Sequence, residues 1–498
     1  MMKPIRALML GLLLSGAILA APAARAQSKI LSAGYASGIA SLDPARAGNL
    51  QEYGYVNAIY NSLTYIDADL SLKPELAVSW TSNADVTSWT FKLREGVTFH
   101  DGRKLTAEDV VYTIKRIQDP KTASRIRSQL EVISDVVAVD PLTVRFDLKI
   151  PYADLPMVLG DYTVRIIPNG HADIAKQPIG TGPFQFVEFV PGDRLVAKKF
   201  AGYWENGLPL AEEVRLRHMP ELATAISALE AGTIHLLADI RPEAVDQLKS
   251  SKTVQVQSAP SGTWFAYVMN NSKPPFDNPK VRQAFAALVD KKEVIDFASF
   301  GTGVRSLTTI PPTSPYYLKD YQEPAPDVAR AKALLAEAGV SNLNLKIFYP
   351  SADTEQERMA LVLRERAKLI GVSIELSGVP NDKFYADVEG KEALATTLFF
   401  GRPTPDTQTY LWYVTNGSYN VWKYSNPEAD RILNAARRAS DEAERRKLYQ
   451  DLQKQILADT PGIVVYVKSI ATGVRNNVKG FRPHPRAWVE LKAVSLAN

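Results

Sequence analysis

The segment from Phe399 to Trp422 carries the side chains best suited to bind a small solute. Seven aromatic residues are interleaved there with Arg402, Asp406, Asn416 and Asn420. Pockets for small molecules usually have apolar and aromatic walls with a few polar groups that fix orientation. An arginine can grip a carboxylate through two hydrogen bonds, and an aspartate can accept an ammonium group. The alternative interpretation is a buried hydrophobic strand followed by a polar turn.

Catalytic motifs are not evident in the sequence. The five histidines are scattered, and no HExxH pair would place two metal ligands on one helix face. There is no GxSxG nucleophile elbow and no P-loop. The absence of cysteine excludes disulfides, thiolate metal sites and cysteine nucleophiles. Carboxylates are plentiful, but nothing in the sequence pairs two of them as a glycosidase requires. We expect no enzymatic activity, no cofactor and no metal.

Residues 1–26 have the pattern of a secretory signal peptide. Lys3 and Arg6 precede an apolar run over residues 7–20, and residues 24–26 (Ala-Arg-Ala) form a small-x-small cleavage site. An uncleaved membrane anchor is the alternative, but the run is shorter than the roughly 20 residues that span a bilayer. We therefore expect a mature periplasmic protein that begins at Gln27.

The mature chain is close to neutral. Three of the 58 lysines and arginines lie in the predicted signal peptide, which leaves 55 basic against 54 acidic residues. Phosphate binding needs a concentrated basic face, so nucleic acid is not an expected partner. The 498 residues favour two or three domains over a single core. Without a cysteine to carry lipid, the protein is expected to diffuse freely in the periplasm.

The elements that position the candidate side chains are clearest between Trp89 and Arg116. Apolar and polar residues alternate over 89–94, which is typical of a half-buried strand. Asp101-Gly102 marks a turn. Thr106 with Asp109 three residues later resembles a capping box, which opens a helix. The sequence therefore predicts a strand, a turn and a helix in this stretch.

Helix and strand patterns continue to alternate in the second half of the chain, which predicts an α/β lobe. Helices are expected over 221–231, 280–290, 328–338 and 354–370, the last capped by Thr354, and from Asn426-Pro427 and Ser440; strands are expected over 264–270, 343–349, 372–376 and 463–467.

The stretches 74–80 and 89–116 together resemble the signature of the bacterial extracellular solute-binding proteins, family 5, which are peptide/nickel-type receptors of ABC importers. Pro178–Phe184, Phe200–Trp204 and Ala225–Gly232 are similar to further parts of that pattern. The resemblance implies an α/β, two-lobed periplasmic-binding-protein fold of type II, cluster C-like, with an extra N-terminal subdomain. It implies this division: lobe I from 27–60 with 170–268 and 470–498, the extra subdomain from 61–169, and lobe II from 269–469.

The resemblance also bears on the ligand. Peptide-binding members of the family tend to carry an aspartate in the loop that corresponds to residues 401–406, where it holds the amino terminus of the peptide. That acid is absent here unless Asp406 substitutes for it. An anionic solute that meets Arg402 is therefore a competing hypothesis, and nickel ligation is poorly supported because the segment contains no histidine.

We expect six residues to contact the solute: Tyr35, Thr181, Trp264, Arg402, Asp406 and Asn420. Arg402 would pair with an anionic group, Asp406 with a cationic one, and Trp264 would stack. Thr181 lies between Gly180 and Gly182, which allow close approach to the main chain. A structural turn is the alternative interpretation of that motif.

The expected function is that of a monomeric receptor that captures a small solute, either a peptide or a peptide-like or anionic conjugate, between two lobes. It would deliver the solute to the ABC permease in the inner membrane. A secreted hydrolase of peptides or glycans is the alternative, and a chaperone-like interaction protein is a third hypothesis.

Overall fold

The computed structural model describes residues 29–39, 41–47, 52–171, 173–402 and 404–497. The predicted signal peptide lies outside these ranges. Within them, no helix is both long and apolar enough to cross a membrane.

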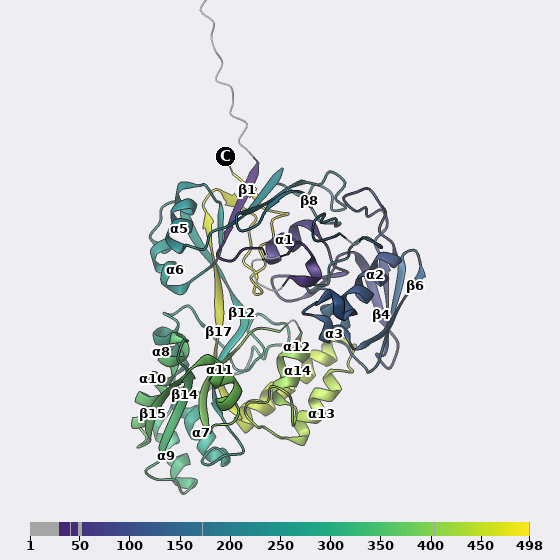
Figure 1. Cartoon of the computed structure of the whole chain (residues 1–498). Helices are drawn as coiled ribbons and strands as arrows, with labels where there is room; N and C mark the ends of the chain where they lie inside the picture. Colours follow the sequence, from purple (N-terminus) through teal and green to yellow (C-terminus); the bar gives the residue numbers. More distant parts are fainter. Residues whose placement is uncertain (1–28, 40, 48–51, 172, 403, 498) are drawn as a thin grey trace, which may run out of the picture.

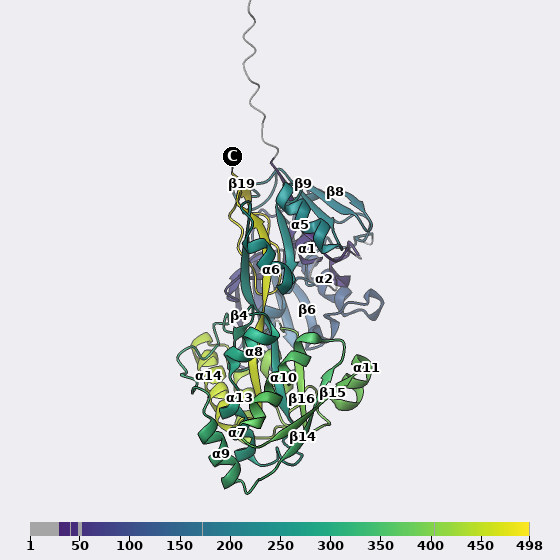
Figure 2. The ribbon, with the colours of Figure 1, turned by 90° about the vertical axis from the view of Figure 1, so that its left-hand side faces the viewer.

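Two long antiparallel strands run through both halves of the molecule. They are β12 (Val254–Met269) and β17 (Gly462–Arg475), which pair from Val254 opposite Arg475 to Val268 opposite Gly462. Figure 1 shows them passing from the upper body into the lower one, and Figure 2 shows the same crossing after a quarter turn. They belong to an eleven-stranded sheet of order β15-β14-β16-β12-β17-β11-β1-β10-β9-β8, with β13 pairing β17.

The upper body is built on the second half of that sheet. Its strands are β1 (Ile30–Tyr35), β8 (Phe184–Val190), β9 (Arg194–Lys199), β10 (Glu213–His218) and β11 (Leu236–Ile240). The helices α1 (Glu52–Ile59), α5 (Leu222–Ala231) and α6 (Pro242–Lys249) pack with them. Gly232 closes α5 with a φ of 82°, a conformation that favours glycine.

A separate four-stranded antiparallel sheet lies beside the upper body (Figure 1). Its order is β4 (Ala77–Ser82), β5 (Ser88–Leu93), β7 (Thr143–Leu148) and β6 (Ile133–Asp140), and α2 (Ala107–Gln118) packs on β6. The predicted strand, turn and capped helix are confirmed here. The backbone amide of Thr106 donates to Asp109 over 2.7 Å in the predicted capping box.

The lower body places helices on both faces of its part of the sheet. Strands β14 (Asn344–Pro350), β15 (Ser373–Val379) and β16 (Leu394–Phe399) extend β12. One core joins them to α7 (Pro279–Leu288), α8 (Lys291–Ala298), α9 (Val328–Glu337) and α10 (Thr354–Lys368). A second core joins them to α12 (Pro405–Tyr413), α13 (Pro427–Ala436) and α14 (Glu442–Asp459).

Short elements complete the chain. They are η1 (Pro44–Arg46), β2 (Thr64–Ile66), β3 (Leu72–Pro74), η2 (Pro120–Thr122), α3 (Arg127–Leu130), α4 (Leu155–Val158), β13 (Val304–Arg305), α11 (Asn381–Lys383), η3 (Phe384–Val388), β18 (Val478–Lys479) and β19 (Ser495–Leu496).

Two predicted helix starts were wrong by a small shift, and the helices α6, α8 and α12 are among those that were not predicted. Asp353 caps α10 by accepting from the amides of Glu355 and Gln356, so Thr354 is the first helical residue and not the cap. Asp441 caps α14, one residue after Ser440. An aspartate with a free carboxylate beside a Ser or Thr competes well for the cap. Helix α12 lies in the aromatic segment, where the alternative had been a strand and a turn.

Candidate ligand cleft

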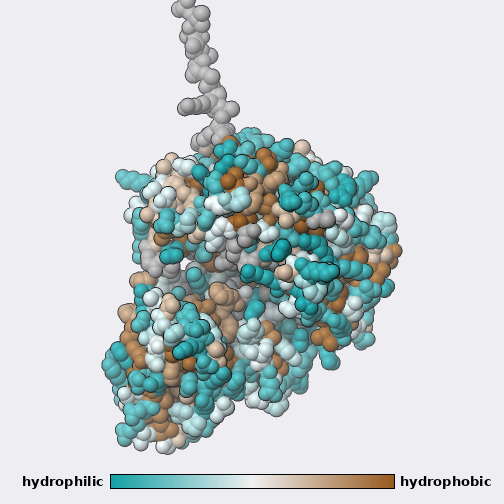
Figure 3. All heavy atoms as spheres, in the orientation of Figure 1, coloured by the Kyte–Doolittle hydropathy of each residue, from teal (hydrophilic) through white to brown (hydrophobic). Residues whose placement is uncertain are grey.

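The strand register identifies which edges of the two bodies face each other. β12 runs from the upper body to the lower one, and β16 is antiparallel to it, so β16 ends at Phe399 on the side of the upper body. β11 is antiparallel to β17 and parallel to β1, so β1 ends at Tyr35 on the side of the lower body. The space-filling view is hollowed between the two bodies (Figure 3). Ligands of α/β folds bind outside the carboxyl ends of such strands.

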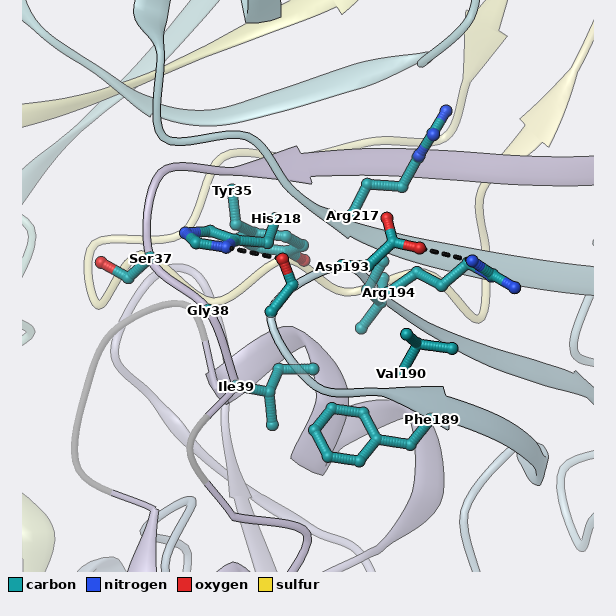
Figure 4. Close-up of a pocket in the computed structure, with 12 residues that line it drawn as sticks. Tyr35, Ser37, Gly38, Ile39, Phe189, Val190, Asp193, Arg194, Arg217 and His218 are labelled. Carbon is teal, nitrogen blue, oxygen red and sulfur yellow. Dashed lines mark hydrogen bonds and ion pairs between the residues drawn. The ribbon is translucent and has the colours of Figure 1, made fainter.

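A small pocket lies at the carboxyl ends of β1 and β10 (Figure 4), the edge of the upper body that the strand register turns toward the lower body. Tyr35, Ser37 and Ile39 line it together with His218, whose Nδ1 lies 3.1 Å from the carbonyl oxygen of Gly192. The Tyr35 hydroxyl is buried and has no hydrogen-bond partner among the described residues. Burial raises the pKa of this phenol, so it stays protonated and can donate a hydrogen bond.

The lower wall is an aromatic platform, which we define as Phe399, Phe400, Trp412 and Tyr419. Trp412 and Tyr419 are stacked with ring centroids 5.4 Å apart, and Phe399 lies edge-on to both. Phe400 is 74% exposed, more than any other large hydrophobic side chain of the described residues. Trp264 stacks on Trp422 behind the platform and is 1% exposed, so it supports the platform from inside.

Arg402 lies over the rings of the platform. Its guanidinium carbon is 5.3 Å from the centroid of Tyr419 and 5.7 Å from that of Trp412. Its Nε is buried without a hydrogen-bond partner, and the structure assigns it no ion pair with any described residue. Its carbonyl oxygen accepts from the side-chain amide of Gln408 over 2.9 Å, which ties the loop to α12. The arginine is thus held in place by rings and keeps its charge available.

Asp406 is engaged within the protein. Its Oδ1 lies 3.2 Å from Nε of Arg437, and its backbone amide donates to Asp154 over 3.2 Å. Asp154 in turn lies 3.0 Å from Nη1 of Arg445. We call these four residues the charged junction. Asp154 precedes α4 in the region of the four-stranded sheet, which we call the small subdomain, while Asp406 lies in α12, Arg437 directly follows α13, and Arg445 lies in α14.

Burial affects the protonation state of Asp406 in the charged junction. It raises the pKa of Asp406 to about 7, and the Arg437 guanidinium opposes this while the Asp154 carboxylate adds to it. The Asp154 carboxylate is the first of the charges that raise the pKa of Arg445 against its own burial. The junction is therefore a buried contact whose charge changes near neutral pH.

Two other candidate residues make internal hydrogen bonds. Asn420 is buried, its side-chain amide donates to the carbonyls of Val414 and Tyr424, and its oxygen accepts from the Tyr424 amide. Thr181 is fully buried and its hydroxyl donates to Asn61 over 3.2 Å.

The glycines beside Thr181 pack against the end of α1. A Cβ at Gly180 would lie 2.0 Å from the carbonyl oxygen of Ile59. The geometry of this motif therefore favours the structural turn.

The structure thus brings Trp264, Arg402, Asp406 and Asn420 into one region of the lower body and places Tyr35 and Thr181 in the upper body. As solute contacts, all six stay predictions. Sequence reasoning missed α12, although Thr404-Pro405 is the cap and first-turn proline of a helix start. It also missed Asp154, Arg437 and Arg445, which are far apart in sequence and carry no local signal.

The fold and the facing walls define a two-lobed solute-binding protein. Residues 71–421 match the family described as bacterial extracellular solute-binding proteins, family 5, middle region. The match covers more than half of the chain, so the chain belongs to this family. Family 5 solute-binding proteins are receptors of ABC importers and not enzymes.

Named relatives extend the match over almost the whole chain. The glutathione-binding protein GsiB of Pectobacterium atrosepticum is 29% identical over 502 residues, which cover 97% of each chain. The substrate-binding protein CtaP of Listeria monocytogenes is 26% identical with a TM-score of 0.82, covering 95% of this chain and all of that one.

Two further solved structures differ in how well they superpose. The periplasmic murein tripeptide-binding protein MppA, in its unliganded open form, has a TM-score of 0.87 at 22% identity, covering 95% of this chain and 98% of that one. AgaA from A. tumefaciens R10, in complex with agropinic acid, has a TM-score of 0.70 at 25% identity, covering 94% and 99%. Over its whole length, the chain superposes better on the open structure.

Within the described residues, no group of three or more His, Cys, Asp or Glu side chains could hold a metal ion.

Proposed function

We propose that this protein captures a peptide-like solute between its lobes and presents it to an inner-membrane ABC permease. The family match over residues 71–421 is the observation that carries the proposal. The glutathione-binding relative and the tripeptide-binding and agropinic acid-binding structures support a solute of this size and polarity. The aromatic platform with Arg402 supports a site at the end of β16.

The lobes would close by bending β12 and β17 where these paired strands pass from the upper body into the lower one. The ladder between these strands shifts register twice, between Pro260 and Trp264 and between Phe265 and Ala266, and we propose that the bend occurs at these irregularities. A solute that contacts both walls only in the closed form would shift the hinge equilibrium toward that form. The better superposition on an unliganded open structure supports an open arrangement of the lobes in this structure.

Within the cleft, we propose Arg402 as a direct contact, and Tyr35 as a wall residue of the upper body whose hydroxyl lies beside Gly54 of α1. Arg402 has a charge without an acidic partner, and the Tyr35 hydroxyl has an unfilled hydrogen bond. The internal hydrogen bonds of Thr181 and Asn420, and the burial of Trp264, support a role in shaping the walls. Asp406 would reach a solute only if its pairing with Arg437 opened.

The division into lobe I, the extra subdomain and lobe II is part of this proposal. We also propose that residues 1–26 are cleaved, that the protein is released into the periplasm as a monomer, and that its partner is the permease. The separate hydrophobic core formed by residues 76–166, together with Ala45 and Leu63, supports an extra subdomain. The periplasmic relative MppA supports the location.

Native mass spectrometry of the mature chain from Gln27 tests the function. The protein would be measured as purified and after exposure to pools of di- and oligopeptides, γ-glutamyl peptides, amino-acid conjugates and sugars. We expect one solute mass retained per chain, with no new product mass in the supernatant. Retention of nothing from any pool, or turnover of a pool member, would overturn the proposal.

A further inference from the structure

We propose that the solute enters the lower wall with a negatively charged group, held by Arg402 on the aromatic platform, so that the receptor selects acidic peptide-like solutes over neutral and basic ones. This rests on the proposed function and names the charge class of the solute at that site.

The first argument is the charge balance at the lower wall. The acids at this edge of the sheet are engaged: Asp353 caps α10 and accepts from the Gln356 side chain over 2.9 Å, and Glu355 accepts from the Tyr466 hydroxyl over 2.7 Å. Arg402, in contrast, contacts aromatic faces and pairs with no carboxylate of the described residues. A cation in that position supplies the complementary charge for an anionic ligand group.

The second argument is that Asp406 is a poor receptor for an ammonium group. Its carboxylate is 5% exposed and lies 3.2 Å from the Arg437 guanidinium. To accept a ligand cation, it would have to leave Arg437 without its partner inside the protein, which is costly. Arg402 lies four residues earlier, in the loop before α12, and carries the opposite charge, so this wall favours anions.

The third argument is the geometry of the guanidinium. The guanidinium carbon lies over the rings of Tyr419 and Trp412, and the Arg402 side chain donates no hydrogen bond to any described residue, so its fork of donors is available. Such a fork matches a carboxylate or phosphate with two parallel hydrogen bonds. Phe400, two residues earlier in the chain, is exposed and offers apolar surface for another part of the solute.

The loop that carries Arg402 also touches the hinge. A Cβ on Gly401 would lie 2.7 Å from the Cα of Gly262 in β12, so the two backbones are in contact. An anion bound to Arg402 would therefore lie next to Gly401, the residue that contacts the strand at which the lobes close.

The test measures binding by calorimetry with three probe pools: γ-glutamyl and N-acyl amino acids with free carboxylates, the same compounds as carboxamides, and basic dipeptides with amidated ends. The mature protein is expected to bind members of the acidic pool at least tenfold more tightly than their amides. Arg402→Gln should remove most of that preference, Arg402→Lys should keep part of it, and Arg402→Glu should shift binding toward the basic pool. Arg330→Gln, on α9 at the far end of the lower body, is the matched control and should change nothing.

The outcomes separate this inference from the proposed function. Binding of amides or basic probes with equal or higher affinity than the acids would overturn the charge assignment and leave the receptor function intact. An Arg402→Gln variant that still prefers acids would overturn the role of Arg402. Failure of all three pools to bind would overturn the charge assignment, and only failure of the peptide, conjugate and sugar pools of the mass-spectrometric test as well would overturn the receptor function. Far-ultraviolet circular dichroism and the melting temperature of each variant would show that the platform loop has not unfolded.

Discussion

The chain connects its upper and lower parts at two places that use opposite chemistry. At the hinge, β12 and β17 cross as paired backbones flanked by apolar side chains. At the charged junction, Asp154 of the small subdomain meets Asp406, Arg437 and Arg445 of the lower body, all largely buried. The two strands of the hinge can bend while the backbone of each stays continuous. The junction must keep its ion pairs or break them at a cost.

We therefore expect the two contacts to have different roles when the lobes move. Backbone pairing interrupted by two register shifts tolerates a change of angle between the lobes. Buried ions tolerate little displacement, because desolvated charges that lose a partner are strongly destabilised. The junction is therefore expected to fix the small subdomain on the lower body, and the hinge to carry the motion. The predictions below act on one contact at a time.

The largest effect is expected from Arg445→Met. This change keeps much of the side-chain volume and leaves the Asp154 carboxylate buried without its partner, which should cost about 3–5 kcal/mol of unfolding free energy. Chemical denaturation followed by circular dichroism measures it.

The matched control for this variant is Arg446→Met, the next residue on α14. Its ion pair with Glu442 is exposed at the surface and 3.6 Å long, so its loss should cost at most about 1 kcal/mol. The double variant Asp154→Asn/Arg445→Met should recover part of the stability, because the unpaired charge is gone. Equal losses for Arg445→Met and Arg446→Met would show that the junction is not a buried contact in solution.

The pH dependence of the junction is the next largest effect. Burial raises the pKa of Asp406 to about 7, above its value of 3.8 in model compounds, and Arg437, Asp154 and Arg445 face this carboxyl. Because the folded state holds the proton more tightly, this group adds stability that is full below about pH 4 and is lost as pH rises through 7. Asp406→Asn should remove that component.

The measurement compares unfolding free energies at pH 5 and pH 8 for the wild type and Asp406→Asn. The decrease between the two pH values should be larger in the wild type. Other buried carboxyls with raised pKa, such as Glu389, contribute equally to both proteins and cancel. An identical decrease in both proteins would mean that Arg437 keeps Asp406 ionised across this range.

At the hinge, Gly262→Ala tests the contact with the platform loop. The added Cβ would lie 2.9 Å from the Cα of Gly401, so one of the two backbones must shift. We expect a cost of about 1–3 kcal/mol, typical of overpacking, and a weaker affinity for solute because Arg402 follows Gly401. Calorimetry on a solute identified by mass spectrometry measures this. Gly401→Ala should act on the same contact, so the two effects should not add. Additive effects would argue against a shared contact.

Local patterns in the sequence predicted several helix and strand positions, whereas the two-lobed fold was implied by the family resemblance. The capping box at Thr106, the proline after Asn278 and Asn426, and the glycine after α5 are short signals, and each element lies where they indicated. The shifts at Asp353 and Asp441 arose because neighbouring residues competed for the same cap. Such competition is decided by backbone geometry, which the sequence does not display.

The candidate site was predicted only in part, and the reason lies in tertiary contacts. The segment 399–422 contains the platform, but its spacing does not tell which rings face outward; Phe400 is exposed while Trp412 is buried. Asp406 and Arg402 look equally available in the sequence. They differ because Asp406 contacts Arg437, 31 residues away in the chain, and Asp154, 252 residues away. Ion pairs at such distances carry no periodic signal.

The smallest effect is expected from Thr263→Ala, which removes a hydrogen bond at the hinge without adding bulk. The Thr263 hydroxyl accepts from the backbone amide of Gly401 over 3.4 Å, a long bond on a half-buried residue. Its loss should cost no more than about 1 kcal/mol of stability, since the net value of such a bond is small. Solute affinity measured in parallel should fall less than in Gly262→Ala. If Thr263→Ala weakens binding as much as Gly262→Ala does, the hydrogen bond and not the backbone contact orients the loop of Arg402.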